Sequence, residues 1–272
     1  MMKKEVISTL AVLSLMMMGS MCSLAILADQ GTAQQKELEA FLKTAKVVDI
    51  EIGGLGGRNE PWRITLNAGK TTRKGIFKYQ DRPAPGFFPV SYKREIAAYE
   101  LTKLFKMDIV PPVVEREIIR KNDSPRKGSL QIMVEGCVNE MDRRAKKLEP
   151  PDAKAFENAM EELNVFENLV YCPRDVKDIL VHKDTWKVCR VDFMEAFDTL
   201  SELLPGATIS RCSRRLYQGL QLDPKVIETA MKPYLTLKAT QALLDRRNMI
   251  LEKLQSLIKD KGEAAVLFDI KP

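Results

Sequence analysis

The sequence predicts an α+β protein of two lobes, in which a β-rich N-terminal lobe precedes a mainly helical C-terminal lobe. Segments of alternating polar and apolar residues, separated by turn residues, fill most of the chain between residues 47 and 134. Beyond residue 150, apolar residues instead recur at the three- and four-residue spacing of helices. A chain of 272 residues can give this arrangement a sizeable core, either as one large domain or as two lobes.

Three strands are predicted at the start of the first lobe, at residues 47–52, 62–66 and 73–79. A glycine run, Gly53-Gly54-Leu55-Gly56-Gly57, lies between the first two strands, and turn residues at 67–70 separate the second from the third. The glycine run could cover phosphate groups, or it could serve only as a flexible hairpin turn. Prolines in residues 82–86 predict a loop there.

The rest of the first lobe is predicted to contain one helix and two more strands. Residues 95–105 are expected to form an amphipathic helix, because four apolar residues share one face: Ala97, Leu101, Leu104 and Phe105. The prolines at 111 and 112 prevent the helix from continuing. Strands are predicted at 113–119 and, as an antiparallel partner, at 129–134. Residues 135 and 136 are expected to end the lobe.

The second lobe is predicted to be mainly helical. A sustained apolar stripe marks a helix over residues 156–170, and a second one marks a long C-terminal helix over residues 243–258. Between them, residues 179–181 and 187–191 are expected to form a short hairpin. The only histidine, His182, falls at the tip of this hairpin and is interpreted as a surface residue rather than a catalyst.

The N-terminal segment, residues 1–28, reads as a signal peptide or a signal anchor. Two lysines precede an almost uncharged run rich in Leu, Met and Ala, and Asp29 ends it. About 20 apolar residues suffice to span a bilayer, so the run could also remain as an uncleaved membrane anchor. Residues 29–40 are polar and are expected to be a linker or the start of a helix. The body of the protein is therefore predicted to be exported, as a periplasmic, secreted or membrane-anchored protein.

The charge of the chain does not indicate a nucleic-acid partner. The formal net charge is +6 and the isoelectric point is about 9.0, but basic residues alternate with acidic ones along most of the sequence. Without a long basic block, the charge is interpreted as solvated surface. Binding to an anionic membrane through this basic surface remains an alternative, and it predicts vesicle binding that weakens steeply with salt.

The cysteines after Cys22 do not have the spacing of a metal finger, so the sequence does not predict a zinc site. Their even number in an exported protein permits two disulfides, and buried free thiols are the alternative. The four are Cys137, Cys172, Cys189 and Cys212.

One lysine in the first lobe has a setting that suits a phosphate-binding cation. Lys78 follows Ile76 and Phe77, so that its stem can pack on apolar surface while its ammonium reaches a cleft. Glu95, in the first turn of the following helix, is the natural carboxylate to hold it. The spacing alone favours an ordinary surface-packed lysine and a first-turn glutamate stabilised by the helix dipole.

The segments around Glu95 carry a family resemblance. Residues 91–101, Ser-Tyr-Lys-Arg-Glu-Ile-Ala-Ala-Tyr-Glu-Leu, and residues 109–116, Ile-Val-Pro-Pro-Val-Val-Glu-Arg, resemble the corresponding block of secretory-pathway kinases of the Golgi casein kinase type. They resemble more closely exported bacterial proteins with that atypical kinase-like fold, which are related distantly to phosphatidylinositol kinase-like and HipA-like proteins. The resemblance covers roughly residues 41 to 269, including residues 129–136 and the basic-apolar segment 214–216.

The resemblance implies an atypical two-lobed protein-kinase-like fold, with an N-lobe at residues 41–135 and a C-lobe at 136–272. It implies that Lys78 binds the phosphates of ATP and that Glu95 is its ion-pair partner. Glu100 is a second candidate for that partner. It further implies Mg²⁺ or Mn²⁺ as the metal, and an unknown protein, lipid or sugar as the phosphate acceptor.

The catalytic segment departs from the family pattern. The family has an Asp-Arg pair, with an Asn five residues after the Asp and then Ile-Leu or Leu-Leu. Anchoring on Ile179-Leu180 puts Asp178 at the Asn position and Arg174 at the Arg position, so that Pro173 stands where the catalytic Asp belongs. A proline has no base to offer. Asp175 is the best remaining candidate for a base.

The metal-binding end of the pattern fits better. Val191-Asp192-Phe193 occupies the place of the family's Ile-Asp-His or Asp-Phe-Gly-like turn, which implies that Asp192 is a metal ligand. Asp178 would be a second carboxylate ligand, because hard cations prefer oxygen. The alternative is that Asp192 caps a following helix. Glu195 replaces a residue that is often basic in the family.

The sequence thus predicts a kinase-like protein, either a pseudokinase or a weak kinase, that binds ATP and a divalent metal and transfers phosphate weakly or not at all. The scarcity of ATP outside a bacterial cytoplasm favours a binding or regulatory role. The rival hypothesis is an envelope scaffold that uses the kinase-like fold for interactions without nucleotide. The common motifs of serine hydrolases, zinc proteases and P-loop enzymes do not occur.

Overall fold

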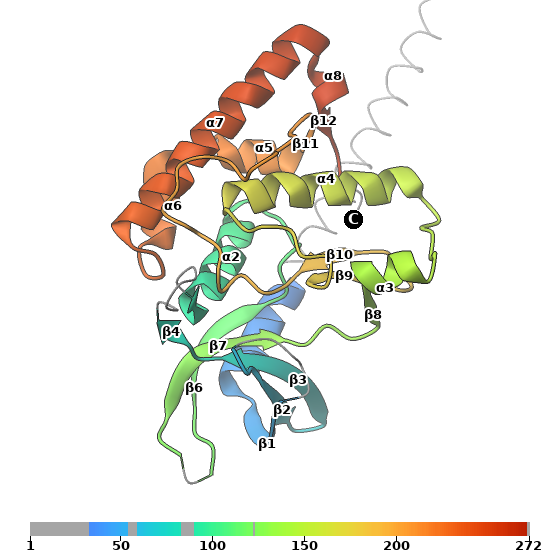
Figure 1. Cartoon of the computed structure of the whole chain (residues 1–272). Helices are drawn as coiled ribbons and strands as arrows, with labels where there is room; N and C mark the ends of the chain where they lie inside the picture. Colours follow the sequence, from blue (N-terminus) through green and yellow to red (C-terminus); the bar gives the residue numbers. More distant parts are fainter. Residues whose placement is uncertain (1–32, 54–58, 83–89, 122, 271–272) are drawn as a thin grey trace, which may run out of the picture.

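A computed structural model of the chain describes residues 33–270, except for 54–58, 83–89 and 122 (Figure 1). The N-terminal lobe is built on a five-stranded sheet with the strand order β1-β2-β3-β7-β6, in which all neighbours are antiparallel. The strands are β1 (Lys46–Ile52), β2 (Trp62–Ala68), β3 (Thr71–Lys78), β6 (Val113–Ile118) and β7 (Arg126–Ile132). Two shorter strands, β4 (Asp81–Arg82) and β5 (Val90–Ser91), pair with each other.

The two faces of this sheet contribute to two different hydrophobic clusters. One face packs with Leu42, from a helix at residues 33–44, and carries the buried rings of Trp62 and Phe77. On β6, Val114 belongs to that cluster, whereas the preceding Val113 belongs to the larger cluster around helix α2 (Tyr92–Leu104). Successive side chains of a strand point to opposite faces, so this sheet connects the two clusters.

The start of helix α2 is fixed by three hydrogen bonds. The Ser91 side chain caps the helix by accepting from the Lys93 amide. The Tyr92 amide donates to the Gln80 carbonyl at 2.9 Å, and the Ser91 amide donates to the Met194 carbonyl at 3.0 Å. Because Met194 comes from the C-terminal lobe, the helix that carries Glu95 is anchored to both lobes.

The C-terminal lobe combines a small three-stranded sheet with a group of helices (Figure 1). Its strands are β8 (Cys137–Asn139), β9 (Ile179–His182) and β10 (Val188–Arg190), in the order β10-β9-β8, together with a parallel pair, β11 (Cys212–Ser213) and β12 (Leu267–Phe268). Its helices are α3 (Glu140–Ala145), α4 (Ala153–Leu169), α5 (Arg214–Leu220), α6 (Pro224–Met231), α7 (Leu237–Lys261) and α8 (Glu263–Val266).

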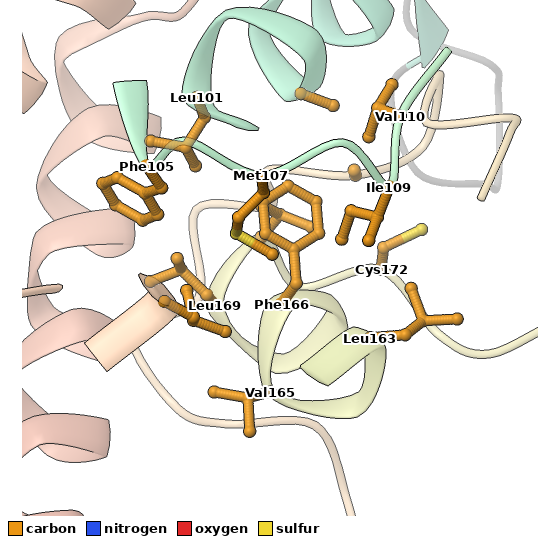
Figure 2. Packing of buried hydrophobic residues seen from close by; sticks show 14 of the residues in the cluster. Leu101, Phe105, Met107, Ile109, Val110, Leu163, Val165, Phe166, Leu169 and Cys172 are labelled. Atoms are coloured by element: carbon orange, nitrogen blue, oxygen red, sulfur yellow. The ribbon is translucent and has the colours of Figure 1, made fainter. Parts of the chain in front are cut away.

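The larger hydrophobic cluster joins α2 to the helical lobe. Figure 2 shows side chains of α2, of the connection that follows it and of α4 meeting in one cluster. Phe105 is the C-terminal cap of α2, Met107 and Ile109 lie in the connection, and Phe166 belongs to α4. Each of these four side chains is at most 3% exposed. Full burial of a large apolar side chain contributes about 1.5–3 kcal/mol, so this cluster holds α2 firmly against the C-terminal lobe.

The connection between the lobes needs a glycine at position 136. Gly136 has φ +71°, a conformation that is unfavourable for residues with a side chain. A Cβ atom there would also lie 2.9 Å from Nε2 of His182. The chain therefore turns tightly past the β9 strand as it leaves the first lobe.

The helices and strands predicted from the sequence are largely confirmed. Most of their observed boundaries differ from the predicted ones by one to three residues. Of the two alternatives for residues 29–40, the described part, from residue 33, is the start of a helix. Arg82, expected in a loop, closes the two-residue strand β4. The predicted signal segment and residues 54–57 of the glycine run lie outside the described residues. Among the residues that are described, no helix is long and apolar enough to cross a bilayer.

The four cysteines after Cys22 are free thiols. The two disulfides that the sequence allowed are therefore not formed. Cys172, Cys189 and Cys212 are buried and Cys137 is half-buried. The alternative of free thiols is therefore the one that the structure shows.

Candidate functional site

Lys78 joins the two lobes through two carboxylates. It lies at the end of β3, and its ammonium forms an ion pair with Glu95 of α2. The same ammonium donates to Oδ1 of Asp192 at 2.9 Å, across 114 residues of sequence. Lys78 is 9% exposed and Glu95 only 1%, whereas the side chain of Asp192 is 48% exposed. The Lys78 ammonium thus forms ion pairs with the buried carboxylate of Glu95 and with the solvent-exposed carboxylate of Asp192.

Local structure explains why Lys78 and Glu95 meet. Phe77 packs on the outer side of the sheet, so the next residue, Lys78, points to the opposite side, where α2 lies. Glu95 is four residues beyond the helix cap Ser91. The sequence therefore places the carboxylate at the N-terminal end of α2, which the Met194 contact holds near the end of β3.

Asp192 sits in a strained turn immediately after β10. Its φ is +66°, in the left-handed region that a non-glycine residue seldom adopts. Aspartate tolerates this conformation better than most residues, and such strain is concentrated at functional sites. No helix begins at Asp192, which excludes the alternative of a helix cap, because residues 191–197 are irregular apart from a turn at 194–195 and a bend at 197.

The environment shifts the pKa of each member of this cluster. Burial alone would lower the pKa of Lys78, but the Glu95 and Asp192 carboxylates together raise it above its ordinary value. Lys78 holds the pKa of Asp192 below its usual range. Burial raises the pKa of Glu95 despite its ion pair. The lysine is consequently a permanent cation at any physiological pH.

Asp178 lies in the same region, immediately before strand β9. Its backbone amide hydrogen-bonds to the Asp175 carbonyl at 3.1 Å, and its own carbonyl accepts from the Val191 amide at 3.0 Å. Its side chain is 28% exposed and contacts Arg190, with a distance of 3.2 Å between Oδ2 and the guanidinium. Burial and the neighbouring Asp192 and Asp175 carboxylates raise the pKa of Asp178 to about 6, although Arg190 opposes the shift.

Asp175 is an exposed residue in the loop between α4 and β9. Its Oδ1 accepts from the Lys177 amide at 2.8 Å, which is a local turn rather than a contact with Lys78 or Asp192. Pro173 is exposed and supplies only its carbonyl, which accepts from Arg190 at 3.5 Å. The loop therefore places the proposed base at the surface, next to a proline that has no proton to exchange.

Two charged residues that the sequence did not single out are buried behind this loop. Arg190 and Glu167 are each 1% exposed, with 3.2 Å between Nε of Arg190 and Oε1 of Glu167. Arg174 binds the other oxygen of Glu167 at 2.7 Å. An arginine in a short apolar strand, two residues before the Asp192 turn, was the signal in the sequence. A charge at an interior strand position needs a carboxylate partner.

The other sequence candidates lie outside this cluster. Glu100, the second candidate partner of Lys78, instead pairs with Lys103 at 2.8 Å on α2. The correction follows from helix geometry, since residues 95 and 100 lie on different faces. His182 ends β9, and its Nδ1 accepts from the Asp184 and Thr185 amides. Gly53 begins the β1–β2 connection at the end of the sheet where Lys78 lies, because Ile52 pairs with Trp62 and Trp62 with Phe77.

The residues present fit a divalent cation with partial coordination from the protein. Oε2 of Glu95 is buried and has no hydrogen-bond partner among the described residues. Asp178 and Asp192 supply oxygen, the ligand that Mg²⁺ and Mn²⁺ prefer. Within the described part of the chain, no group of three or more His, Cys, Asp or Glu is arranged to hold a metal ion alone. Mg²⁺ typically takes only one or two carboxylates and completes its shell with water and phosphate oxygens.

Comparisons with known proteins show which solved structures share the fold of this chain. No family model matches the sequence, and no curated protein matches it. Three solved structures are similar over most of their length. Hydra Fam20 with sugar has a TM-score of 0.65 at 13% identity, covering 87% of this chain and 93% of that one. The Golgi casein kinase has a TM-score of 0.64 at 14% identity, covering 87% and 79%. Its structure with Mn/ADP bound has a TM-score of 0.62 at 13% identity, covering 89% and 80%.

The chain has a Fam20-like atypical kinase fold. This confirms the predicted fold class and the predicted resemblance to Golgi casein kinase-type proteins. At 13–14% identity the likeness establishes the fold, and the roles of individual residues rest on the geometry of this kinase-like chain itself.

Proposed function

We propose that this kinase-like protein binds ATP together with Mg²⁺ or Mn²⁺ in the region of Lys78, and that it transfers phosphate weakly or not at all. The observation that supports it most is the double ion pair of Lys78 with Glu95 and Asp192. It combines a fixed cation with a half-exposed carboxylate, which are the partners that a metal–polyphosphate requires.

In this proposal Lys78 neutralises phosphate oxygens, and Glu95 holds the lysine in position. Asp192 is the main protein ligand of the metal, and Asp178 contributes through the oxygen that Arg190 does not engage. A divalent cation held by these carboxylates would supply positive charge that neutralises the phosphates. The Golgi casein kinase structure with Mn/ADP supports this assignment by analogy of fold.

We expect weak phosphate transfer because the loop between α4 and β9 does not position a catalytic base. A base must lie within hydrogen-bond reach of the hydroxyl whose proton it removes. Asp175 is exposed and is bonded to its own loop, and Pro173 contributes no base. A role in nucleotide binding or regulation therefore fits better than efficient catalysis. The predicted export of the chain points the same way, because ATP is scarce outside a bacterial cytoplasm.

A thermal-shift titration with ATP and Mn²⁺ or Mg²⁺ tests this function. We expect the melting temperature to rise with nucleotide, and Lys78→Ala to abolish the rise. Lys103→Ala is the matched control, because Lys103 also bridges two carboxylates, Glu39 and Glu100, away from the site. The control variant is expected to keep the nucleotide-dependent rise.

Three results would contradict the proposal or one of its residue assignments. No shift at millimolar nucleotide with either metal would favour the alternative of a nucleotide-independent interaction scaffold. A shift that persists unchanged in Lys78→Ala would mean that nucleotide binds elsewhere. Phosphate transfer that survives Asp192→Ala would refute the metal role of Asp192.

A further inference from the structure

Arg190 is a buried cation in contact with a proposed metal ligand. It lies on β10, and its side chain is 2% exposed. The guanidinium is 3.2 Å from Glu167 and 3.2 Å from Oδ2 of Asp178. A buried guanidinium is costly unless it is paired, and here each carboxylate compensates part of that cost.

The same guanidinium binds three further groups in the loop and turn around the site. It donates to the Val191 carbonyl, to Sγ of Cys172 at 3.6 Å and to the Pro173 carbonyl at 3.5 Å. These partners come from the turn before Asp192 and from the loop after α4. A planar group with five fixed donors can hold several segments in one arrangement, which a flexible ammonium cannot do.

Each of the two proposed metal ligands therefore has one oxygen engaged by a side-chain cation. Lys78 binds Oδ1 of Asp192, and Arg190 contacts Oδ2 of Asp178. A divalent ion placed at Oδ2 of Asp178 would face the buried guanidinium at short range. Like charges repel strongly where water is largely excluded, so the structure disfavours a metal there.

We propose that Arg190 is a positioning residue that takes the place of a second cation at Asp178, so that the site accepts one divalent ion with its nucleotide. This inference rests on the proposed function, since it concerns the metal that accompanies the nucleotide. Arg190 keeps the second position permanently charged and fixes the direction of the Asp178 carboxylate. Asp192 and the remaining oxygen of Asp178 would then be the carboxylate ligands available to the single metal.

Counting bound Mn²⁺ and bound ADP per chain tests the inference, by equilibrium dialysis of the whole protein with both ligands. One Mn²⁺ per bound ADP is the expected result. Two Mn²⁺ per ADP would overturn the inference and leave the proposed function intact. Failure to bind either ligand would refute the proposed function, and with it this inference.

Variants of Arg190 test the role of the residue itself. Arg190→Met removes the charge and is expected to raise the count to two Mn²⁺ per ADP, whereas Arg190→Lys is expected to keep one. Arg215→Met is the matched control, because Arg215 also pairs with two carboxylates, Glu162 and Asp108. It should lower stability and leave the count at one. A count that stays at one in Arg190→Met, at unchanged Mn²⁺ affinity, would overturn the inference.

The inference can be tested even if Arg190→Met does not fold. Asp178→Asn in the otherwise native chain is expected to keep one Mn²⁺ per ADP and to weaken its affinity at most several-fold, because Asp192 remains. Complete loss of Mn²⁺ binding in Asp178→Asn, with ADP still bound, would mean that Asp178 is the principal ligand and would overturn the assignment.

Discussion

The two sides of the proposed site differ in how their charged groups are held. Lys78 and Glu95 project from a central strand and from a helix that is anchored to both lobes. On the other side, Asp175 belongs to an exposed loop, and Pro173 precedes it without an ionisable group. Sites built on regular elements are more precise than sites on loops. In this chain, therefore, the structural basis for binding a nucleotide is stronger than the basis for transferring its phosphate.

The largest expected effect concerns the buried ion pair. Lys78→Met leaves the Glu95 carboxylate buried without its main partner, which should lower the free energy of unfolding by about 3–5 kcal/mol in chemical denaturation. The double variant Lys78→Met with Glu95→Gln should recover part of that loss. The exposed pair of Lys93 and Asp81 is the control, and Lys93→Met should change stability by less than about 1 kcal/mol. A loss below about 1 kcal/mol in Lys78→Met would show that the pair is not buried in solution.

A smaller effect is expected from crowding beside Lys78. A Cβ atom at Gly128 would lie 2.3 Å from the Lys78 carbonyl oxygen and 2.8 Å from the Phe77 ring. Gly128→Ala should therefore displace the end of β3, destabilise the protein by about 1–3 kcal/mol and reduce the nucleotide-dependent thermal shift.

Gly69→Ala is the matched control for that crowding. Gly69 lies in the β2–β3 turn at φ +64° with no atom within 4 Å of the added Cβ. Its substitution should cost about 1–2 kcal/mol through backbone strain and leave the nucleotide shift unchanged. An equal loss of nucleotide binding in both variants would contradict the local explanation.

The same comparison explains what the sequence could predict. Alternating residues in β2 follow from a period of two, so this strand was visible in the sequence. Helix α2 was also predicted, but the expectation of a single apolar face was wrong, because residues 95–99, which cover a full turn, are all buried. The meeting of Lys78 with Glu95 was predicted from the resemblance to the kinase family, because the spacing of the two residues alone did not single out this pair. The Glu167–Arg190 pair could not be predicted in this way. It depends on how α4 packs against β10, which no local pattern of residues specifies.

The protonation of Asp178 should make the stability of the folded protein depend on pH. Its pKa in the folded state is about 6, against 3.8 for an ordinary aspartate, because burial and neighbouring carboxylates favour the protonated form. Between these values the folded protein binds more protons than the unfolded chain, so stability should fall as the pH rises from about 4 to about 6. Asp178→Asn should remove a decrease on the order of 1 kcal/mol over this range, measured by denaturation without metal.

Asp245→Asn is the control for this pH dependence. Asp245 is only partly buried, and its bonds to Ser201 and Gln241 hold its pKa below the usual value, so it titrates below that range. Its substitution should leave the decrease between pH 4 and 6 in place. If the decrease also persists in Asp178→Asn, another carboxylate causes it.

The smallest expected effect concerns Asp175, on the loop side. Because its side chain is exposed and bonds only to the nearby Lys177 amide, Asp175→Asn should change stability by less than about 0.5 kcal/mol. The nucleotide-dependent thermal shift should also stay the same, since Lys78 and Asp192 are not in contact with this loop residue. Loss of nucleotide binding in Asp175→Asn would contradict the separation of the two sides. A transfer activity that falls about 100-fold or more at unchanged binding would instead identify Asp175 as the base, because general-base catalysis contributes effects of that size.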